Sequence, residues 1–166
     1  MSTQDVFQTA SRAADEGRGS VHRVLVAFNG SPGSWAALDR AIEIAADNRA
    51  LLTIAAVVQE PRFLWQGPGP MSVPYSRETI RRDLEGELLR HLANARDEVP
   101  ATMSVTIQLL HGRAARALAA FAEAGCYDLV VMGPRSAGRL GRLLRGSVAH
   151  GLLSRGHTSV LAVKAQ

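Results

Sequence analysis

Two glycine-containing segments carry the residue types that bind phosphate groups. The first is Asn29-Gly30-Ser31, and the second contains Gly133 and, further along, Gly146-Ser147. Glycine lets a ligand approach the backbone closely. A serine at the start of a helix adds its hydroxyl to the free amide N–H groups and to the positive end of the helix dipole. These residues therefore predict an anion site.

Four arginines add positive charge around the second segment: Arg135, Arg139, Arg142 and Arg145. On a helix their spacing would form one stripe, which is usually a solvated face. Arg135 is nearest to the predicted phosphate path, so we expect it to contact the ligand. The alternative for both segments is that the glycines serve only as turn residues and a helix cap.

The elements that must position these residues follow from the apolar pattern. Runs over 23–28, 51–58 and 128–132 are continuously apolar and predict strands buried on both faces. Residues 103–109 alternate apolar and polar, which predicts an edge strand, and 159–164 predict a last strand. Helices are expected after Ser31-Pro32, after Ser76, over 113–124 and from Gly146.

Strict alternation of strands and helices predicts an α/β fold with a parallel sheet and helices on both faces. We expect one domain over 21–166, after a flexible tail over 1–20. In such a sheet, ligands bind beyond the carboxyl ends of the strands. Both glycine-containing segments follow strands, so they would meet at that edge if the first and fourth strands are neighbours.

Cysteine and histidine carry little chemistry in this sequence. Cys126 is the only cysteine, which excludes a disulfide framework and a zinc cluster within one chain. Its position just before the fourth strand predicts a buried, inert thiol. The five histidines have no metal-ligand spacing, so we expect no metal site: His22, His91, His111, His150 and His157.

Composition narrows the class of protein further. No apolar run reaches the roughly 20 residues that span a bilayer, and the N-terminal sequence lacks the pattern of a secretory signal. We therefore expect a cytoplasmic protein with no membrane partner. The net charge of +4 is modest, and no recognised nucleic-acid motif is present, so we expect no nucleic-acid partner.

Two stretches resemble the first and last thirds of the universal stress protein family: RVLVAFNGSPGSWAALDRAIEIA and DLVVMGPRSAGRLGRLLRGSVAHGLLSRGHTSVLAVK. Family members carry G-x-x-G, nine residues, then G-[S/T] after the fourth strand. Gly133, Ser136, Gly146 and Ser147 stand at those positions, so three of the four match. The resemblance covers 23–166 and implies a five-stranded, Rossmann-like parallel sheet of order 3-2-1-4-5, with the first and fourth strands adjacent.

The resemblance also implies a function. It suggests a stress-response protein that binds ATP or a related adenine nucleotide, with or without Mg²⁺, and acts through a protein partner without strong catalysis. It implies a homodimer paired through 159–164. The nucleotide-binding residues expected from the family pattern are Ala27, Phe28, Asn29, Val57, Met132, Gly133, Arg135, Ser136, Gly138, Gly146, Ser147 and Val148.

Two departures from the family pattern keep an alternative open. Asn29 replaces the usual acidic residue, and it keeps an acceptor and adds a donor but has no charge. Ser136 replaces the second glycine, where a side chain would crowd a phosphate or be strained by a positive φ. Gly138, two residues later, could supply part of the lost backbone freedom. Because some family members bind no ATP, the alternative is a dimeric interaction module without a nucleotide.

Two further classes of function are weaker alternatives: nucleic-acid binding, which the arginine stripe would suit although no recognised motif is present, and an enzyme. Adenylating enzymes of related fold carry a glycine-serine phosphate loop after the first strand. Residues 29–33 resemble that loop only weakly. The sequence shows no general base placed for phosphoryl transfer and no acidic pair for two metals, so we expect at most slow ATP hydrolysis.

Overall fold

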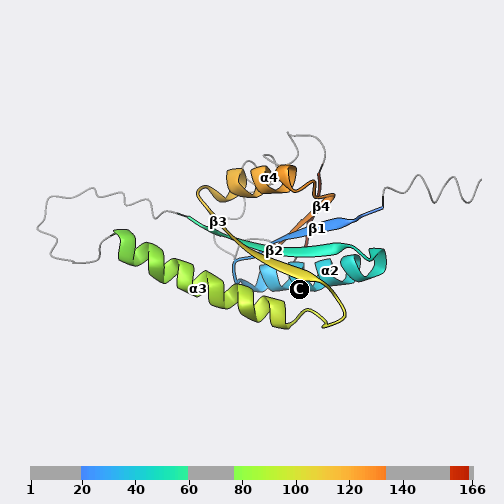
Figure 1. The fold of residues 1–166 in the computed structure, drawn as a ribbon, viewed down its shortest axis with the longest axis horizontal. Coiled ribbons are helices and arrows are strands. Elements are labelled where there is room, and N and C mark those ends of the chain that lie inside the picture. Colours follow the sequence, from blue (N-terminus) through green and yellow to red (C-terminus); the bar gives the residue numbers. More distant parts are fainter. Residues whose placement is uncertain (1–19, 60–76, 134–157, 165–166) are drawn as a thin grey trace, which may run out of the picture.

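The computed structural model describes residues 20–59, 77–133 and 158–164. Strands and helices alternate over residues 20–133, as the apolar pattern predicts (Figure 1). In chain order the elements are β1 (Arg23–Ala27), α2 (Pro32–Asn48), β2 (Leu51–Val58), α3 (Arg77–Asp97), β3 (Val105–His111), α4 (Ala114–Ala124), β4 (Leu129–Met132) and β5 (Ser159–Ala162). The tail predicted over 1–20, apart from Ser20, and the helix expected from Gly146 lie outside the described residues.

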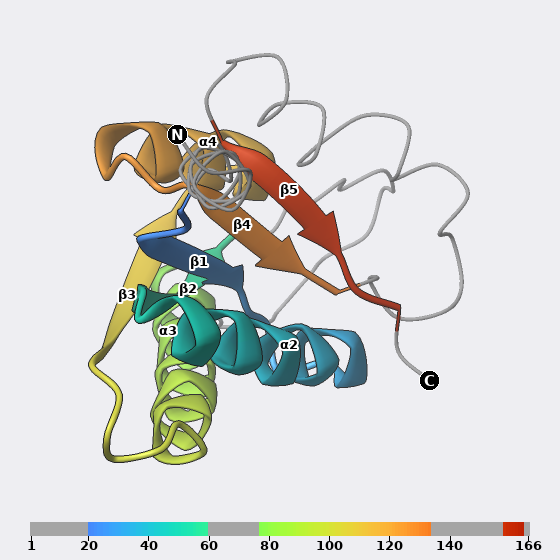
Figure 2. The ribbon, with the colours of Figure 1, turned by 90° about the vertical axis from the view of Figure 1, so that its right-hand side faces the viewer.

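The five strands form one parallel sheet in the order β3-β2-β1-β4-β5, which confirms the predicted fold and strand order. Figure 2 shows β1 and β4 side by side, with β5 beyond β4. β3 is an edge strand, as its alternating pattern predicts. It begins two residues later than expected, because residues 101–103 still belong to the turn after α3, where Met103 N donates to Pro100 O at 2.9 Å.

Helices cover both faces of the sheet: α2 and α3 lie on one face and α4 on the other (Figure 1). Side chains of β1 alternate between the two layers, so Val24 and Val26 pack in the α2 and α3 layer while Leu25 packs against the α4 layer. A central strand must be apolar on both faces to fill both layers, which explains its unbroken apolar run. In the described part of the chain, no helix is long and apolar enough to cross a membrane.

The turn after α4 exposes a residue that the sequence predicts to be buried. Gly125 ends the helix with φ −88°, and the left-handed position is taken by Cys126, whose φ is 49°. Cys126 is exposed, so the predicted buried thiol is wrong. The next residue, Tyr127, fills the buried position instead, where its hydroxyl donates to Thr53 Oγ1 at 2.9 Å.

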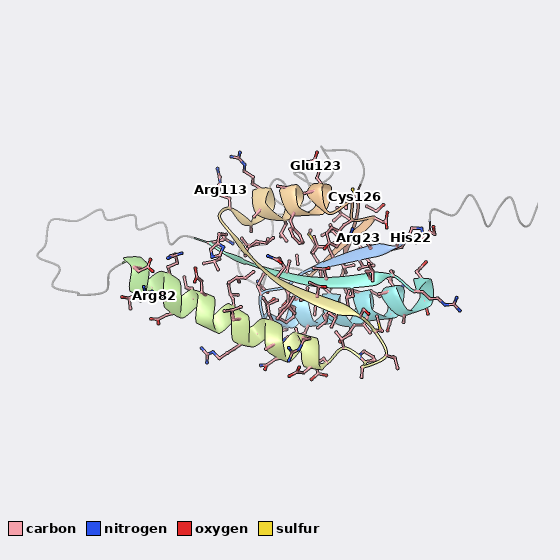
Figure 3. All side chains as sticks on the ribbon, in the orientation of Figure 1. His22, Arg23, Arg82, Arg113, Glu123 and Cys126 are labelled. Carbon is pink, nitrogen blue, oxygen red and sulfur yellow. The ribbon has the colours of Figure 1, made fainter. Side chains whose placement is uncertain are left out.

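Cys126 lies at the amino end of β1, far along the sheet from the edge where a ligand is expected. Figure 3 shows it at the same end as His22 and Arg23. The chain ties this end together through Asp128, whose carboxylate accepts from the backbone N–H groups of His22 and Arg23 at 2.8 and 2.9 Å. The exposed thiol is therefore not part of the candidate site.

Candidate functional site

The carboxyl ends of β1 and β4 lie next to each other in the centre of the sheet. Ala27, the last residue of β1, is paired with Met132, the last residue of β4. The chain then leaves β1 through Phe28 and Asn29 and leaves β4 through Gly133. The two glycine-containing segments therefore begin from adjacent strand ends, which is the arrangement that the sequence required for a shared ligand site.

Asn29, Gly30 and Ser31 form a tight turn after β1. Asn29 is exposed, and its Oδ1 accepts a hydrogen bond from Ser31 N at 3.1 Å. Gly30 has φ +75°, a conformation that residues with a side chain rarely adopt. The Asn29 oxygen is used within the turn, so its amide NH₂ donors are the groups that it can offer to a ligand.

The same turn begins α2. Ser31 has extended backbone angles, and its Oγ accepts from Ser34 N at 3.3 Å, while Pro32 takes the first helical position. The predicted serine cap and proline start are thus confirmed. Because α2 starts at this turn, the positive end of its dipole lies beside the carboxyl end of β1. From the sequence alone, such a dipole is predicted only for the helix at Gly146.

Gly133 touches the first turn of α2. A Cβ added to Gly133 would overlap the carbonyl group of Gly33 and lie 2.9 Å from its Cα. Gly33 is itself buried. Gly133 therefore has a packing role that needs no ligand: it lets the end of β4 contact the helix that follows β1. This contact draws together the two segments predicted to form the site.

The remaining residues predicted for the site differ in how far their side chains are buried. Phe28 is only 3% exposed, and its ring packs edge to face on Trp35 with centroids 4.9 Å apart. Its side chain thus belongs to the core. Ala27, Val57 and Met132 are half-buried on the α4 face of the sheet. The others lie outside the described residues: Arg135, Ser136, Gly138, Gly146, Ser147 and Val148.

His91 lies next to this turn, a contact that the sequence does not predict. It comes from α3, and a Cβ built on Gly30 would lie 2.5 Å from His91 Nδ1 and 2.7 Å from its Cε1. The Nδ1 atom is buried, and it has no hydrogen-bond partner within the described part of the chain. The only sequence signal was its position one residue before Leu92, at the margin of the apolar stripe of α3.

The carboxylate of Glu85 links α3 to the carboxyl end of β3. Glu85 Oε1 lies 2.9 Å from His111 Nε2 and 3.3 Å from Arg81 Nη1. Nearby, hydrogen bonds from Arg81 and Arg82 lower the pKa of the exposed Glu78. β2 separates β3 from β1 in the sheet. The Glu85–His111 contact therefore joins α3 to β3, whereas the arginine contacts stay within α3, and none of them enters the candidate site.

Comparisons with known proteins give one consistent answer. The sequence model of the Universal stress protein family matches residues 20–164. A universal stress protein of Thermus aquaticus, named for the 3′ region of QAH/OAS sulfhydrylase, is 32% identical over 143 residues, with 85% of this chain and 97% of the relative covered. Universal stress protein YxiE of Bacillus subtilis is 29% identical over 147 residues, covering 86% of this chain and 99% of the relative.

A solved structure has the same architecture. It is a universal stress protein in complex with cAMP, with a TM-score of 0.63 and 25% identity, and the match covers 89% of this chain and all of that one. The region that the family model matches, residues 20–164, includes every described strand and helix. On the strand order, the extent of the family match and these relatives, the chain belongs to the universal stress protein family.

Proposed function

We propose that this protein binds ATP or a related adenine nucleotide beyond the carboxyl ends of β1 and β4. The observation that carries the proposal is the pairing of Ala27 with Met132, which brings the Asn29–Ser31 turn and Gly133 to one place. The solved universal stress protein with cAMP supports an adenine nucleotide as the ligand class.

The chemistry of this edge suits a nucleotide with a polar end and a flat apolar end. The turn supplies the Asn29 amide and the start of α2 supplies a positive dipole, and both favour an anion. Ala27, Val57 and Met132 offer half-buried apolar surface beside it. Ligand sites commonly combine such apolar walls with a few polar groups. The arginines from 135 to 145 would add charge.

We assign no catalytic step to this site and propose that the protein acts through partners in the cytoplasm. The first partner is a second copy of the chain, joined through β5. That strand is at an edge of the sheet, with Ser159 and Ala162 exposed. An edge strand carries unpaired backbone groups that favour pairing with another strand.

Thermal unfolding with and without ATP, AMP and cAMP tests the proposed ligand class. A ligand at about 100 times its Kd stabilises the folded state by roughly 2.7 kcal/mol. For a domain of this size that raises Tm by about 5–10 °C. CTP at the same concentration is the control for general anion effects. If adenine nucleotides raised Tm no more than CTP, the proposed function would be wrong.

Ser136→Gly sharpens this test, because it restores the family glycine. We expect stronger nucleotide binding with an unchanged fold, measured by calorimetric titration. Ser104→Gly is the matched control, since Ser104 is exposed and lies at the amino end of β3. Weaker binding by Ser136→Gly would show that the serine itself is a ligand group.

The second candidate is an interaction module without a nucleotide. One observation favours it: Gly133 and the Asn29 oxygen already have partners in the protein, namely Gly33 and Ser31 N. Such a module would still dimerise, yet its Tm would respond to no adenine nucleotide. The same unfolding experiment therefore separates the two functions.

A further inference from the structure

His91 brings an imidazole ring from α3 onto the turn that follows β1. A Cβ at Gly30 would lie 2.5 Å from Nδ1, 2.7 Å from Cε1 and 3.0 Å from Cγ of His91. Three ring atoms thus lie against the hydrogen-only face of Gly30. The ring and the left-handed φ of +75° leave glycine as the residue that fits this position.

The Nδ1 atom of His91 is buried, and the described residues give it no hydrogen-bond partner. A buried polar atom without a hydrogen-bond partner destabilises the folded state. Native proteins leave few such atoms, and each needs an explanation. This one lies against the turn that carries Asn29, so a hydrogen bond to it would stabilise that turn.

We propose that His91 is a positioning residue for nucleotide binding, an inference that rests on the proposed function. Its ring holds Gly30 in the left-handed conformation, which fixes where Asn29 presents its amide. Its Nδ1 gains a hydrogen bond when the turn adjusts around a bound nucleotide. The nucleotide-bound state is thereby favoured over the free state by a contact that the ligand itself does not make.

His91→Phe tests this proposal, because it keeps an aromatic ring on Gly30 and removes Nδ1. We expect a higher Tm without nucleotide, since an unpaired buried nitrogen is gone, together with ATP binding weakened about tenfold by calorimetric titration. His91→Asn, which keeps a polar atom near the position of Nδ1, should recover part of the lost affinity. His22→Phe is the matched control, since His22 is exposed at the amino end of β1.

The nitrogen can also be followed directly. In protein labelled with ¹⁵N-histidine, the His91 signals are those absent from His91→Phe, and we expect the Nδ1 signal to move when ATP is added. A purely structural histidine would show neither that movement nor a rise in Tm combined with a loss of affinity.

The outcomes separate this inference from the proposed function. If the wild-type protein bound no adenine nucleotide, both would be wrong. If it bound ATP and His91→Phe bound ATP equally well, the inference alone would be wrong. A lower Tm for His91→Phe would show that Nδ1 already has a partner in the free protein, which would also overturn the inference.

Discussion

Gly133 and Gly30 are both required at the candidate site, and each is required by a different neighbour. Gly133 contacts the backbone of Gly33, whereas Gly30 contacts the ring of His91 and also has a positive φ. Neither contact involves a ligand. At the residue scale, the glycines of the site first serve packing, and any nucleotide uses the space and donors that this packing leaves.

Gly133→Ala should destabilise the protein, because the new Cβ meets backbone that cannot rotate away. Overpacking typically costs about 1–3 kcal/mol, and we expect the upper end, measured as the free energy of unfolding in urea. Gly86→Ala is the matched control: Gly86 lies in α3 with nothing near a new Cβ, and alanine there should add roughly 0.5–1 kcal/mol. Equal stability of wild type and Gly133→Ala would contradict the packing role.

Some residue-level features could be predicted from the sequence because their causes are local. The Ser31 cap and the Pro32 start depend on residues within one turn. The exposure of Cys126 could not be predicted, because it depends on Tyr127 reaching Thr53 across the layer. The contact of His91 with Gly30 depends on how α3 is placed over the sheet, which no local pattern specifies.

At the scale of elements, α2 connects the fold to the site. Its apolar face packs on the sheet through Ala37, Leu38 and Ala41, and its first turn both follows β1 and contacts Gly133. The helix therefore fixes the distance between the two segments of the site. The strands and helices themselves could be predicted because each shows a continuous, alternating or helical apolar pattern. The two-residue error at β3 arose where a turn precedes the strand.

Ser31→Ala removes the side chain that caps α2. We expect a loss of about 1 kcal/mol in unfolding free energy, since Ser34 N loses its side-chain acceptor. Ser31→Gly should lose only a few tenths of a kcal/mol in unfolding free energy, because glycine is itself tolerated at helix starts. Urea unfolding of the two variants measures both losses, and an unchanged free energy of unfolding in Ser31→Ala would show that the Ser31 hydroxyl does not act as the cap.

At the scale of the whole molecule, the open edge at β5 determines whether one copy pairs with another. Ser159 N and Val163 N donate to Asp128 O and Met132 O. Because strand residues alternate in direction, the N–H groups of Val160 and Ala162 point away from β4. These two outward groups are the ones that a partner strand would use.

Ala162→Pro should dissociate the proposed homodimer and leave the monomer folded, since it removes an outward N–H without touching the β4 pairing. Leu161→Pro is the matched control, because it removes an N–H that faces β4 and should destabilise the sheet itself. Sedimentation gives the mass and circular dichroism gives the fold. A dimer that survived Ala162→Pro would mean that the copies pair elsewhere.

The strand order that places β1 beside β4 could be predicted only through the family resemblance. Alternation of strands and helices fixes a parallel sheet, but it does not fix which strands are neighbours. The place of the candidate site beside the ends of β1 and β4 follows from that order. The residues after Gly133 that the sequence assigns to it lie outside the described residues.

Amide NMR of ¹⁵N-labelled protein during titration with ATP tests the location of the site most directly. The account predicts that the largest shift changes among the described residues cluster at Asn29, Gly30, Ser31 and Gly133, with little change at the amino end of the strands around His22 and Cys126. Changes centred on that opposite end, or none at a saturating concentration, would contradict it.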